Sequence, residues 1–352
     1  MKTKLAILFG GKSDEYSVSL HSAAAIIKNV PEEMFDVTLV GITQDGKWLL
    51  YEGSADKVND DTWHKKSLSP VFLNMGSDFK GLVKLNLDNN TFEKIEVDCI
   101  FPVLHGRNGE DGTIQGLCQM SGIPFVGCDM TSSAVSMDKE FTHIICENAG
   151  IDTAPYISAV NSSKLNVKKL YEQAFEKLSL PMFIKPANNG SSIGISKIRN
   201  YEEFEKGIME EFQFDSKVVI EKMIEGFEIG CAVLGNEELT IGEVDEIDTK
   251  NDFFDYVEKY NQHNSKIYCP ARISDELKKE AKLIAEKTYR ALGCKGLARV
   301  YMFVTPENKI YLNEINTIPG LTDLSRYPSM LKKIGIDYRD LIVKLVELSL
   351  EQ

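Results

Sequence analysis

The chain has 352 residues and a formal net charge of −13, and it is 43% hydrophobic and 26% charged. This length is enough for two or three domains, each with its own core, and the composition is typical of a globular protein. No apolar run approaches the roughly 20 residues that span a bilayer, so we expect no membrane segment. The negative charge argues against a nucleic acid or an anionic membrane as partner, although it is compatible with a local basic pocket.

The seven cysteines are irregularly spaced, and no pair has the C-x-x-C spacing of a zinc site. We therefore expect buried, reduced thiols, which are typical of a cytoplasmic protein.

The first part of the chain alternates strands and helices. A strand at 4–9, a glycine turn, a helix at 17–29 and a strand at 36–42 predict an open α/β sheet. Turn residues between 43 and 95 indicate hairpins. The next expected elements are a strand at 96–104, a helix at 112–120, a strand at 123–126 and a helix at 131–148.

The later part of the chain is richer in successive strands, which favour an antiparallel sheet that carries a ligand. Strands at 181–186 and 193–198 enclose a glycine-containing loop. The remaining expected elements are a helix at 201–212, strands at 217–222, 228–234 and 239–244, an ordered loop at 251–267, a helix at 275–292, a hairpin of strands at 296–304 and 310–315, and a helical tail from 324.

Three segments combine glycines with charged residues: 10–15, 105–112 and 185–194. In the first, glycines let the backbone approach a ligand, and the helix that follows favours an anion. The second segment, 105–112, consists of glycines and of charged or polar residues, which is not the composition of a hydrophobic core. The third suits a polyphosphate, because backbone N–H groups can surround its oxygens while Lys185 supplies a positive charge. It is not a Walker A motif, since no G-K-[ST] follows four spacer residues.

The C-terminal part adds a candidate metal site. Arg299 lies on one predicted strand, and Glu314 and Asn316 lie on its neighbour. Glu314 and Asn316 are two residues apart, so they share a strand face. Two oxygen ligands on one face suit a Mg²⁺ ion that bridges phosphates.

Together these segments resemble the D-alanine–D-alanine ligase family over most of the chain. The resemblance implies an ATP-grasp fold preceded by a Rossmann-like domain, an α/β class that becomes α+β in its later parts. It implies an N-terminal substrate-binding domain at 1–127, a central ATP-grasp domain at 128–224 and a C-terminal domain with the catalytic and metal residues at 225–352. The matching segments, which occur in the family's order, are 10–19, 105–116, 136–139, 185–194, 258–260 and 313–320.

The same resemblance implies ATP and two divalent ions, Mg²⁺ or Mn²⁺, as cofactors. The phosphates are assigned to Lys139 and Lys185, and the metal to Glu314 and Asn316. Lys222 and Glu228 are assigned to the adenosine, and the strand from Glu221 to Ile224 to the adenine.

For the substrates, the resemblance implies that D-alanine is phosphorylated by ATP and that the amine of a second D-amino acid then attacks the acyl phosphate, for cell-wall synthesis in a cytoplasmic homodimer. Because water would hydrolyse this intermediate, we expect a lid, and the aromatic loop 251–267 is the candidate. The resemblance assigns Glu15 to the amino group of the first D-alanine, and it places Glu15, Ser191 and Tyr260 in one hydrogen-bonded set. It places His105 in the substrate site and assigns Arg299 and the Gly320 backbone to the oxyanion. Lys259 and Ser325 are assigned to the carboxylate of the second substrate.

Arg326 suggests D-serine as the second substrate, because a hydroxymethyl group can use a guanidinium and a methyl group cannot. The position resembles that of D-alanine–D-serine ligases, and Asp245 and Phe254 are expected to line the same pocket. If Arg326 instead points to solvent or pairs with Asp323, an ordinary D-alanine–D-alanine ligase is expected. D-lactate is disfavoured, because the Lys-Tyr pair at 259–260 is intact.

One position departs from the family pattern. Tyr301 stands where the family carries a metal-binding aspartate, two residues after Arg299. Tyrosine is a poor Mg²⁺ ligand at neutral pH because its pKa is near 10. This departure leaves open a weakened ligase, a site in which Asp248 or another acid substitutes, or a catalytically silent ATP-binding protein.

Overall fold

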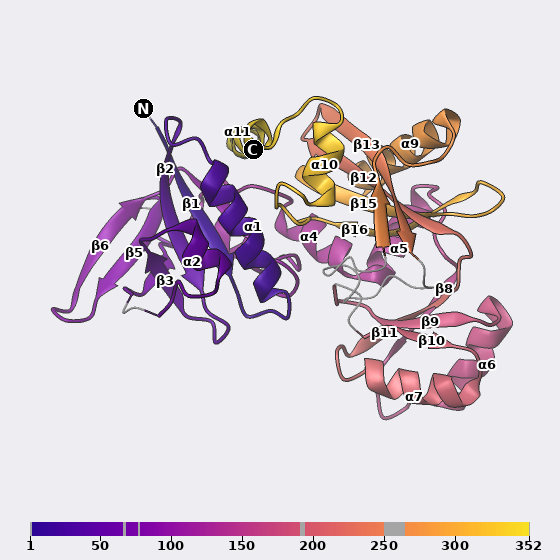
Figure 1. Cartoon of the computed structure of the whole chain (residues 1–352). Helices are drawn as coiled ribbons and strands as arrows, with labels where there is room; N and C mark the ends of the chain where they lie inside the picture. Colours follow the sequence, from indigo (N-terminus) through magenta and orange to yellow (C-terminus); the bar gives the residue numbers. More distant parts are fainter. Residues whose placement is uncertain (1, 66–67, 77, 191–193, 250–264, 352) are drawn as a thin grey trace.

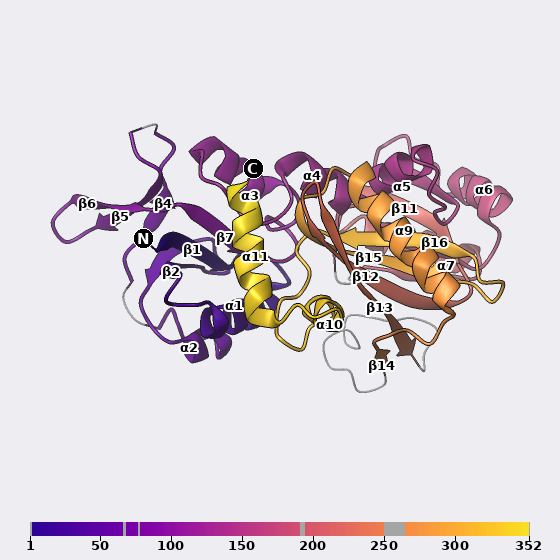
Figure 2. The same cartoon turned by 90° about the horizontal axis from the view of Figure 1, so that it is seen from above.

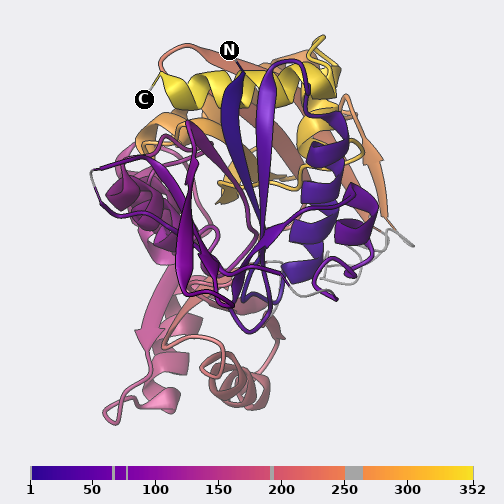
Figure 3. The ribbon, with the colours of Figure 1, turned by 90° about the vertical axis from the view of Figure 1, so that its left-hand side faces the viewer.

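The computed structural model describes residues 2–65, 68–76, 78–190, 194–249 and 265–351. These residues form an N-terminal region, a smaller central region and a C-terminal region, and the central region extends away from the other two (Figures 1 and 3). Among the described helices, none has the length and apolar character needed to cross a membrane.

The N-terminal region contains two sheets. Its elements are β1 (Thr3–Gly10), α1 (Tyr16–Asn29), β2 (Phe35–Ile42), β3 (Trp48–Tyr51), α2 (Ala55–Asn59), β4 (Val71–Leu73), β5 (Gly81–Asn86), β6 (Thr91–Glu96), β7 (Cys99–Val103) and α3 (Thr113–Ser121). The first sheet has the order β3-β2-β1-β7, in which β1 pairs in parallel with β2 and β7. The second is the antiparallel sheet β4-β5-β6. The predicted open α/β start and the hairpins after it are confirmed.

Two expected strands of this region are wrong in extent. The predicted strand at 96–104 is divided between β6 and β7, which belong to different sheets. The break occurs where Asp98 pairs with Lys4 of β1, through its backbone N–H and its carboxylate. The predicted strand at 123–126 forms only an isolated parallel bridge between Phe125 and Ile100. Both segments are apolar enough to resemble strands, but tertiary pairing decides their length.

The central region contains one antiparallel sheet with two helices on one face, and two earlier helices that pack against the core of the C-terminal sheet. Its elements are α4 (Met130–Met137), α5 (Lys139–Asn148), β8 (Tyr156–Val160), α6 (Val167–Leu178), β9 (Met182–Pro186), β10 (Ser196–Ile198), α7 (Tyr201–Glu211) and β11 (Lys217–Lys222). The strand order is β10-β9-β11-β8, and α6 and α7 bury their apolar residues against it. The strand assigned to adenine was predicted to include Glu221 to Ile224, but β11 ends at Lys222.

The predicted single helix at 131–148 is two helices. The chain breaks at Asp138, whose backbone is extended and whose carboxylate accepts hydrogen bonds from the N–H groups of Glu140 and Phe141. Such a side-chain cap begins a new helix. The break places Lys139 at the first position of α5, where its N–H bonds the Ala187 carbonyl at 3.0 Å.

The C-terminal region is built on a five-stranded antiparallel sheet. Its elements are β12 (Phe227–Gly235), β13 (Leu239–Thr249), β14 (Ser265–Tyr268), α9 (Asp275–Ala291), β15 (Gly296–Val304), β16 (Ile310–Asn316), α10 (Arg326–Lys332) and α11 (Tyr338–Leu350). The strand order is β14-β13-β12-β15-β16, which confirms the predicted run of strands and the β15–β16 hairpin. Helix α9 packs on one face of the sheet with Ile229 and Cys231, and α10 packs on the other with Ala232 and Leu234.

The last helix joins the C-terminal sheet to the N-terminal region. Figure 2 shows α11 lying along the N-terminal sheet. Its apolar residues share one core with β1, α1 and β7, and the Ser349 hydroxyl lies 3.0 Å from the Cys99 thiol of β7. The same core includes Leu297 of β15 and Met330 of α10. This shared packing fixes the N-terminal region against the sheet that carries Arg299 and Glu314.

Candidate active site

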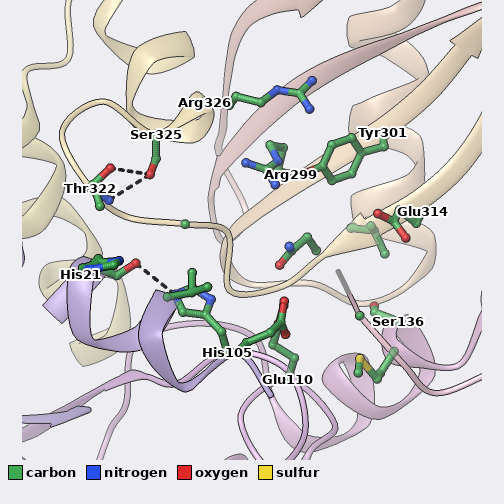
Figure 4. Close-up of a pocket in the computed structure, with 18 of the residues that line it drawn as sticks. His21, His105, Glu110, Ser136, Arg299, Tyr301, Glu314, Thr322, Ser325 and Arg326 are labelled. Carbon is green, nitrogen blue, oxygen red and sulfur yellow. Dashed lines mark hydrogen bonds between the residues drawn. The ribbon is translucent and has the colours of Figure 1, made fainter. Parts of the chain in front are cut away.

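A cavity of about 330 Å³ lies where the three regions meet (Figure 4). It brings together predicted residues that are far apart in sequence, and Tyr301 lines it as well. The predicted residues that line the cavity are Glu15, His105, Lys139, Arg299, Glu314, Asn316, Gly320, Ser325 and Arg326. Ser191, Phe254, Lys259 and Tyr260 lie outside the described residues, as does most of the expected lid.

Glu15 connects the N-terminal region to the glycine loop. Its carboxylate lies so close to Gly106 that a Cβ atom there would overlap Glu15 Oε2, and Gly106 also has a positive φ of 67°. A Cβ on Gly190 would lie 3.2 Å from the same oxygen. The carboxylate is thus held against the residue that precedes Ser191, although the expected hydrogen bonds with Ser191 and Tyr260 fall outside the described residues.

Glu110 is a site residue that sequence reasoning missed. Its carboxyl accepts hydrogen bonds from the N–H groups of Gly106, at 2.8 Å, and Ile318, at 3.2 Å. Burial and the nearby Glu15 carboxylate raise the pKa of Glu110 to about 8. A glutamate inside the glycine-rich segment 105–112 was the available signal. Glu110 therefore holds its proton near neutral pH, next to the Glu15 carboxyl.

His105 joins two segments more than 200 residues apart. Its Nδ1 lies 2.9 Å from the Ile318 carbonyl, and its Nε2 lies 3.1 Å from Ser22 Oγ, which accepts a bond from the Leu321 N–H at 3.3 Å. Burial lowers the pKa of His105 to about 4, so the ring is neutral at pH 7. If the ring proton is on Nδ1, the imidazole donates to the Ile318 carbonyl and its Nε2 accepts from the Ser22 hydroxyl. His105 therefore fixes the loop that carries Gly320, and both of its nitrogens are already engaged.

Lys139 lies at the entrance of the glycine loop. Its ammonium donates to the Asn189 carbonyl at 2.7 Å, and Asn188 is held by Asp215 through bonds of 2.8 and 3.0 Å. These bonds order the beginning of the loop and direct a positive charge into the cavity. This is the arrangement that a phosphate group requires.

Lys185 lies in a second buried cluster, outside the residues that line the cavity. Its ammonium lies 2.6 Å from Glu221, whose other oxygen lies 3.0 Å from His143 Nε2. Despite burial, the charge of Lys185 and the bond from His143 hold the pKa of Glu221 far below its usual range. His143 stacks on Tyr156, and nothing in the sequence pattern indicated its role. Lys222 ends β11 as an exposed residue.

Arg326 neither points to solvent nor pairs with Asp323. Its Nε and Nη2 donate to the two oxygens of Asp245 at 2.7 and 2.6 Å, and its Nη1 donates to Glu228 at 3.2 Å. These carboxylates outweigh the effect of burial and raise the pKa of Arg326, so it stays charged. Asp245 is fully buried behind Arg326 and does not line the cavity, contrary to expectation. Glu228, which the resemblance assigns to adenosine, accepts the hydrogen bond from Arg326 Nη1.

Ser325 shapes the turn before α10. Its hydroxyl accepts from the Thr322 N–H at 3.1 Å and lies 2.7 Å from the Thr322 hydroxyl. A Cβ on Gly320 would lie 3.2 Å from Ser325 Oγ, so the loop passes close to this hydroxyl. Gly320, Thr322 and Ser325 therefore line the cavity together with Arg326. Figure 4 shows Thr322 and Ser325 next to each other.

The expected metal ligands lie on one strand face. Glu314 of β16 pairs with Tyr301 of β15, and Asn316 pairs with Arg299. Asn316 Oδ1 is buried and has no hydrogen-bond partner among the described residues. A buried carbonyl oxygen left in this way, next to a carboxylate, fits a hard divalent cation. The described part of the chain contains no group of three or more His, Cys, Asp or Glu side chains placed to hold a metal, so substrate or water oxygens would complete the shell.

Asp248 does not substitute for the missing aspartate. It lies three residues beyond Asp245 on β13, and its side chain therefore points to the opposite face of the sheet. There it accepts a hydrogen bond from Arg272 at 2.8 Å, together with Glu246.

Comparisons with known proteins agree with this geometry. The model of the D-ala D-ala ligase N-terminus matches residues 4–128, and that of the D-ala D-ala ligase C-terminus matches residues 145–347. The chain belongs to the D-alanine–D-alanine ligase family. It is therefore an ATP-dependent ligase with the ATP-grasp fold, as the motifs predicted, and its family serves peptidoglycan synthesis and generally uses Mg²⁺.

Two curated relatives and one solved structure show the extent of the similarity. The D-alanine–D-alanine ligase of Acetivibrio thermocellus is 41% identical, over 100% of this chain and 96% of the relative. D-alanine–D-alanine ligase A of Escherichia coli K12 is 39% identical, with the same coverage. The crystal structure of VanG D-Ala:D-Ser ligase from Enterococcus faecalis is 44% identical and superposes with a TM-score of 0.91, over 99% of this chain and 100% of that chain.

Proposed function

We propose that the enzyme joins D-alanine to D-serine. A carboxylate oxygen of D-alanine attacks the γ-phosphorus of ATP, giving D-alanyl phosphate and ADP. The amine of D-serine then attacks the acyl carbon, a C–N bond forms, phosphate leaves and the amine loses a proton. The product would end cell-wall precursors with D-serine. The proposal includes a cytoplasmic homodimer and the three domains 1–127, 128–224 and 225–352.

The buried guanidinium of Arg326 carries the choice of D-serine. A guanidinium has five N–H groups. Three of them bond Asp245 and Glu228, which leaves two for a ligand as far as the described residues extend. The serine hydroxyl can accept from these groups, whereas a methyl group leaves them unpaired. An unpaired polar group at a buried site costs about 1–3 kcal/mol, which corresponds to roughly a 5- to 150-fold preference.

The first substrate fits the opposite side of the cavity. Glu15 lies where an ammonium group needs a carboxylate, beside the protonated Glu110. Arg299 and the loop of Gly320 line the cavity between this point and Arg326. A carbonyl oxygen placed there would receive positive charge as the tetrahedral intermediate forms.

The phosphates of ATP fit between the central and C-terminal sheets. We assign them to Lys139, whose ammonium lines the cavity, and to Lys185, which would exchange its bond with Glu221 for one with phosphate. Glu314 and Asn316 would hold a divalent cation. When bound, that ion neutralises charge on the phosphoryl oxygens. The adenosine roles of Glu221, Lys222, Ile224 and Glu228 remain part of the proposal.

The alternative is an ordinary D-alanine–D-alanine ligase. Two observations favour it: the curated relatives carry that name, and the charge of Arg326 is already balanced by Asp245 and Glu228. A further alternative, a weakened or silent ATP-binding protein, rests on Tyr301. The placement of Lys139, Glu15 and Asn316 around one cavity supports an active site instead.

A substrate competition tests the proposal. Purified enzyme receives ATP, Mg²⁺, and D-alanine and D-serine at equal concentrations, and the dipeptides are separated by chromatography. We expect D-alanyl-D-serine to dominate at pH 7. Substitution Arg326→Met should lower its share about tenfold or more and leave D-alanyl-D-alanine as the main product.

The matched control is Arg290→Met, which removes an exposed arginine on α9 that pairs with Glu286. Its product ratio should equal that of the original enzyme. A preference for D-alanyl-D-alanine in the unmodified enzyme would refute D-serine specificity, and the absence of either dipeptide despite ATP binding would favour the silent protein.

A further inference from the structure

Four residues stand side by side across the C-terminal sheet. Asp245 of β13 pairs with Gly230 of β12, Gly230 pairs with Tyr301 of β15, and Tyr301 pairs with Glu314 of β16. Residues in register on neighbouring strands project to the same face of the sheet. Because Gly230 has no side chain, a gap opens between the Asp245 carboxylate and the Tyr301 ring.

The guanidinium of Arg326 fills this gap. A Cβ on Gly230 would lie 2.6 Å from Arg326 Nη2 and 2.7 Å from Asp245 Oδ1, which is closer than a real Cβ can approach. The guanidinium carbon lies 4.9 Å from the centroid of the Tyr301 ring. That distance is within the range of about 6 Å in which an aromatic ring attracts a cation.

The same ring contacts a second guanidinium. The Arg299 guanidinium carbon lies 4.5 Å from the Tyr301 centroid. Figure 4 shows Arg299, Tyr301 and Arg326 together along one wall of the cavity. Two positive groups near each other repel, and the electron-rich ring attracts both. Tyr301 thus contacts the arginine assigned to the oxyanion and the arginine assigned to the second substrate.

We propose that Tyr301 is a positioning residue for second-substrate selection, which holds Arg326 over Gly230 and fixes its distance from Arg299. The inference rests on the proposed role of Arg326 in binding D-serine. Asp245 and Glu228 restrain the guanidinium by hydrogen bonds, and the aromatic ring supports it from the side of the cavity. The D-serine hydroxyl then meets N–H groups that are already oriented, so little ordering is needed on binding.

Three substitutions separate this role from that of a lost metal ligand. Tyr301→Phe keeps the ring and removes the hydroxyl, Tyr301→Leu removes the ring, and Tyr301→Asp introduces a carboxylate. For each purified enzyme, kcat and KM are measured for D-serine and D-alanine as second substrates, with Mg²⁺ varied. Unfolding temperatures establish that each variant is folded, and calorimetry reports Mg²⁺–ATP binding independently of turnover.

We expect Tyr301→Phe to keep the KM for D-serine within about twofold. Tyr301→Leu and Tyr301→Asp should raise that KM about tenfold, a size typical of a lost cation–π contact, with little change in the KM for D-alanine. More Mg²⁺ should not restore it. Gly230→Ala, which displaces Arg326 from the other side, should produce the same selective increase.

Two results would overturn the inference. One is a Tyr301→Leu enzyme that folds and keeps its preference for D-serine. The other is a Tyr301→Asp enzyme that binds Mg²⁺–ATP more tightly and turns over faster while its KM for D-serine is unchanged, since Tyr301 would then matter only as a missing metal ligand. A preference of the unmodified enzyme for D-alanine would instead refute the proposed function.

Discussion

The two sides of the active-site cavity treat buried charge in opposite ways. On the N-terminal side, burial favours neutral forms: the pKa of Glu110 rises to about 8 and that of His105 falls to about 4. On the C-terminal side, Arg326 is equally buried, yet Asp245 and Glu228 keep it charged. Burial alone therefore does not determine ionisation, and the presence of an opposite charge decides the outcome.

This difference suits two structural roles, namely holding loops in place and binding a ligand. Neutral Glu110 and His105 use their hydrogen bonds on backbone groups at Gly106 and Ile318, so they hold loops in place. Among the described residues, three N–H groups of the charged Arg326 are engaged, and the proposed function assigns the other two to the ligand. Under the proposed function, one side of the cavity holds the loop of Gly320 in place, and the other recognises the second substrate.

The largest expected effect comes from removing the partner of Arg326. In Asp245→Asn, a buried guanidinium loses its main counter-charge, and we expect a loss of about 3–5 kcal/mol in the free energy of unfolding. Urea unfolding followed by circular dichroism measures it, and the selectivity for D-serine should be lost as well.

The control for this prediction is the double variant Asp245→Leu/Arg326→Met. It removes both charges and should recover most of the stability without recovering D-serine selectivity. If Asp245→Asn alone is as stable as the original enzyme, the ion pair with Asp245 is not what keeps Arg326 charged on the C-terminal side of the cavity.

A smaller effect is expected from Glu110. Its folded pKa of about 8 lies above its unfolded value near 4.5, so between these values the folded protein holds a proton that the unfolded chain releases. Stability should therefore fall as pH rises through this window. In Glu110→Gln, the decline in unfolding temperature between pH 6 and 8 should be flatter. An unchanged slope would contradict the assignment of a neutral Glu110.

The smallest effect concerns His105. Its folded pKa of about 4 lies below its unfolded value of 6.5, so the unfolded chain binds the proton first as pH falls. The contribution of neutral His105 is present above pH 6.5 and is lost between pH 6.5 and 4. In His105→Asn, which keeps a donor toward Ile318, this acid-side loss should be reduced. Thermal unfolding at pH 5 and pH 7 compares the two proteins.

Much of the fold was predictable, because β1 contains a continuous apolar run and α9 has a clear helical period. Where local pattern and tertiary contact compete, prediction was wrong. The helix at 131–148 is broken because Asp138 caps a new helix, and no apolar period reports a cap inside a helical stretch. The segment at 123–126 looks like a strand and forms only one bridge.

The candidate site was predictable where motifs carried it, since Glu15, Lys139, Arg299 and Arg326 meet in one cavity. The hydrogen-bond and ion-pair partners of the site residues were not predictable. The pairing of Arg326 with Asp245 joins residues 81 positions apart, and it depends on a missing side chain at Gly230. The cluster of Lys185, Glu221 and His143 similarly depends on which strands become neighbours.

The most direct test of D-serine specificity is phosphate release from ATP by purified enzyme with Mg²⁺ and a fixed, low concentration of D-alanine, while D-serine is added. We expect release to rise strongly with D-serine and the mixed dipeptide to accumulate in proportion, because in the proposed function Arg326 offers oriented donors to the hydroxyl. Release that depends on D-alanine alone and is unaffected by D-serine would contradict the role of Arg326 as the residue that selects the second substrate.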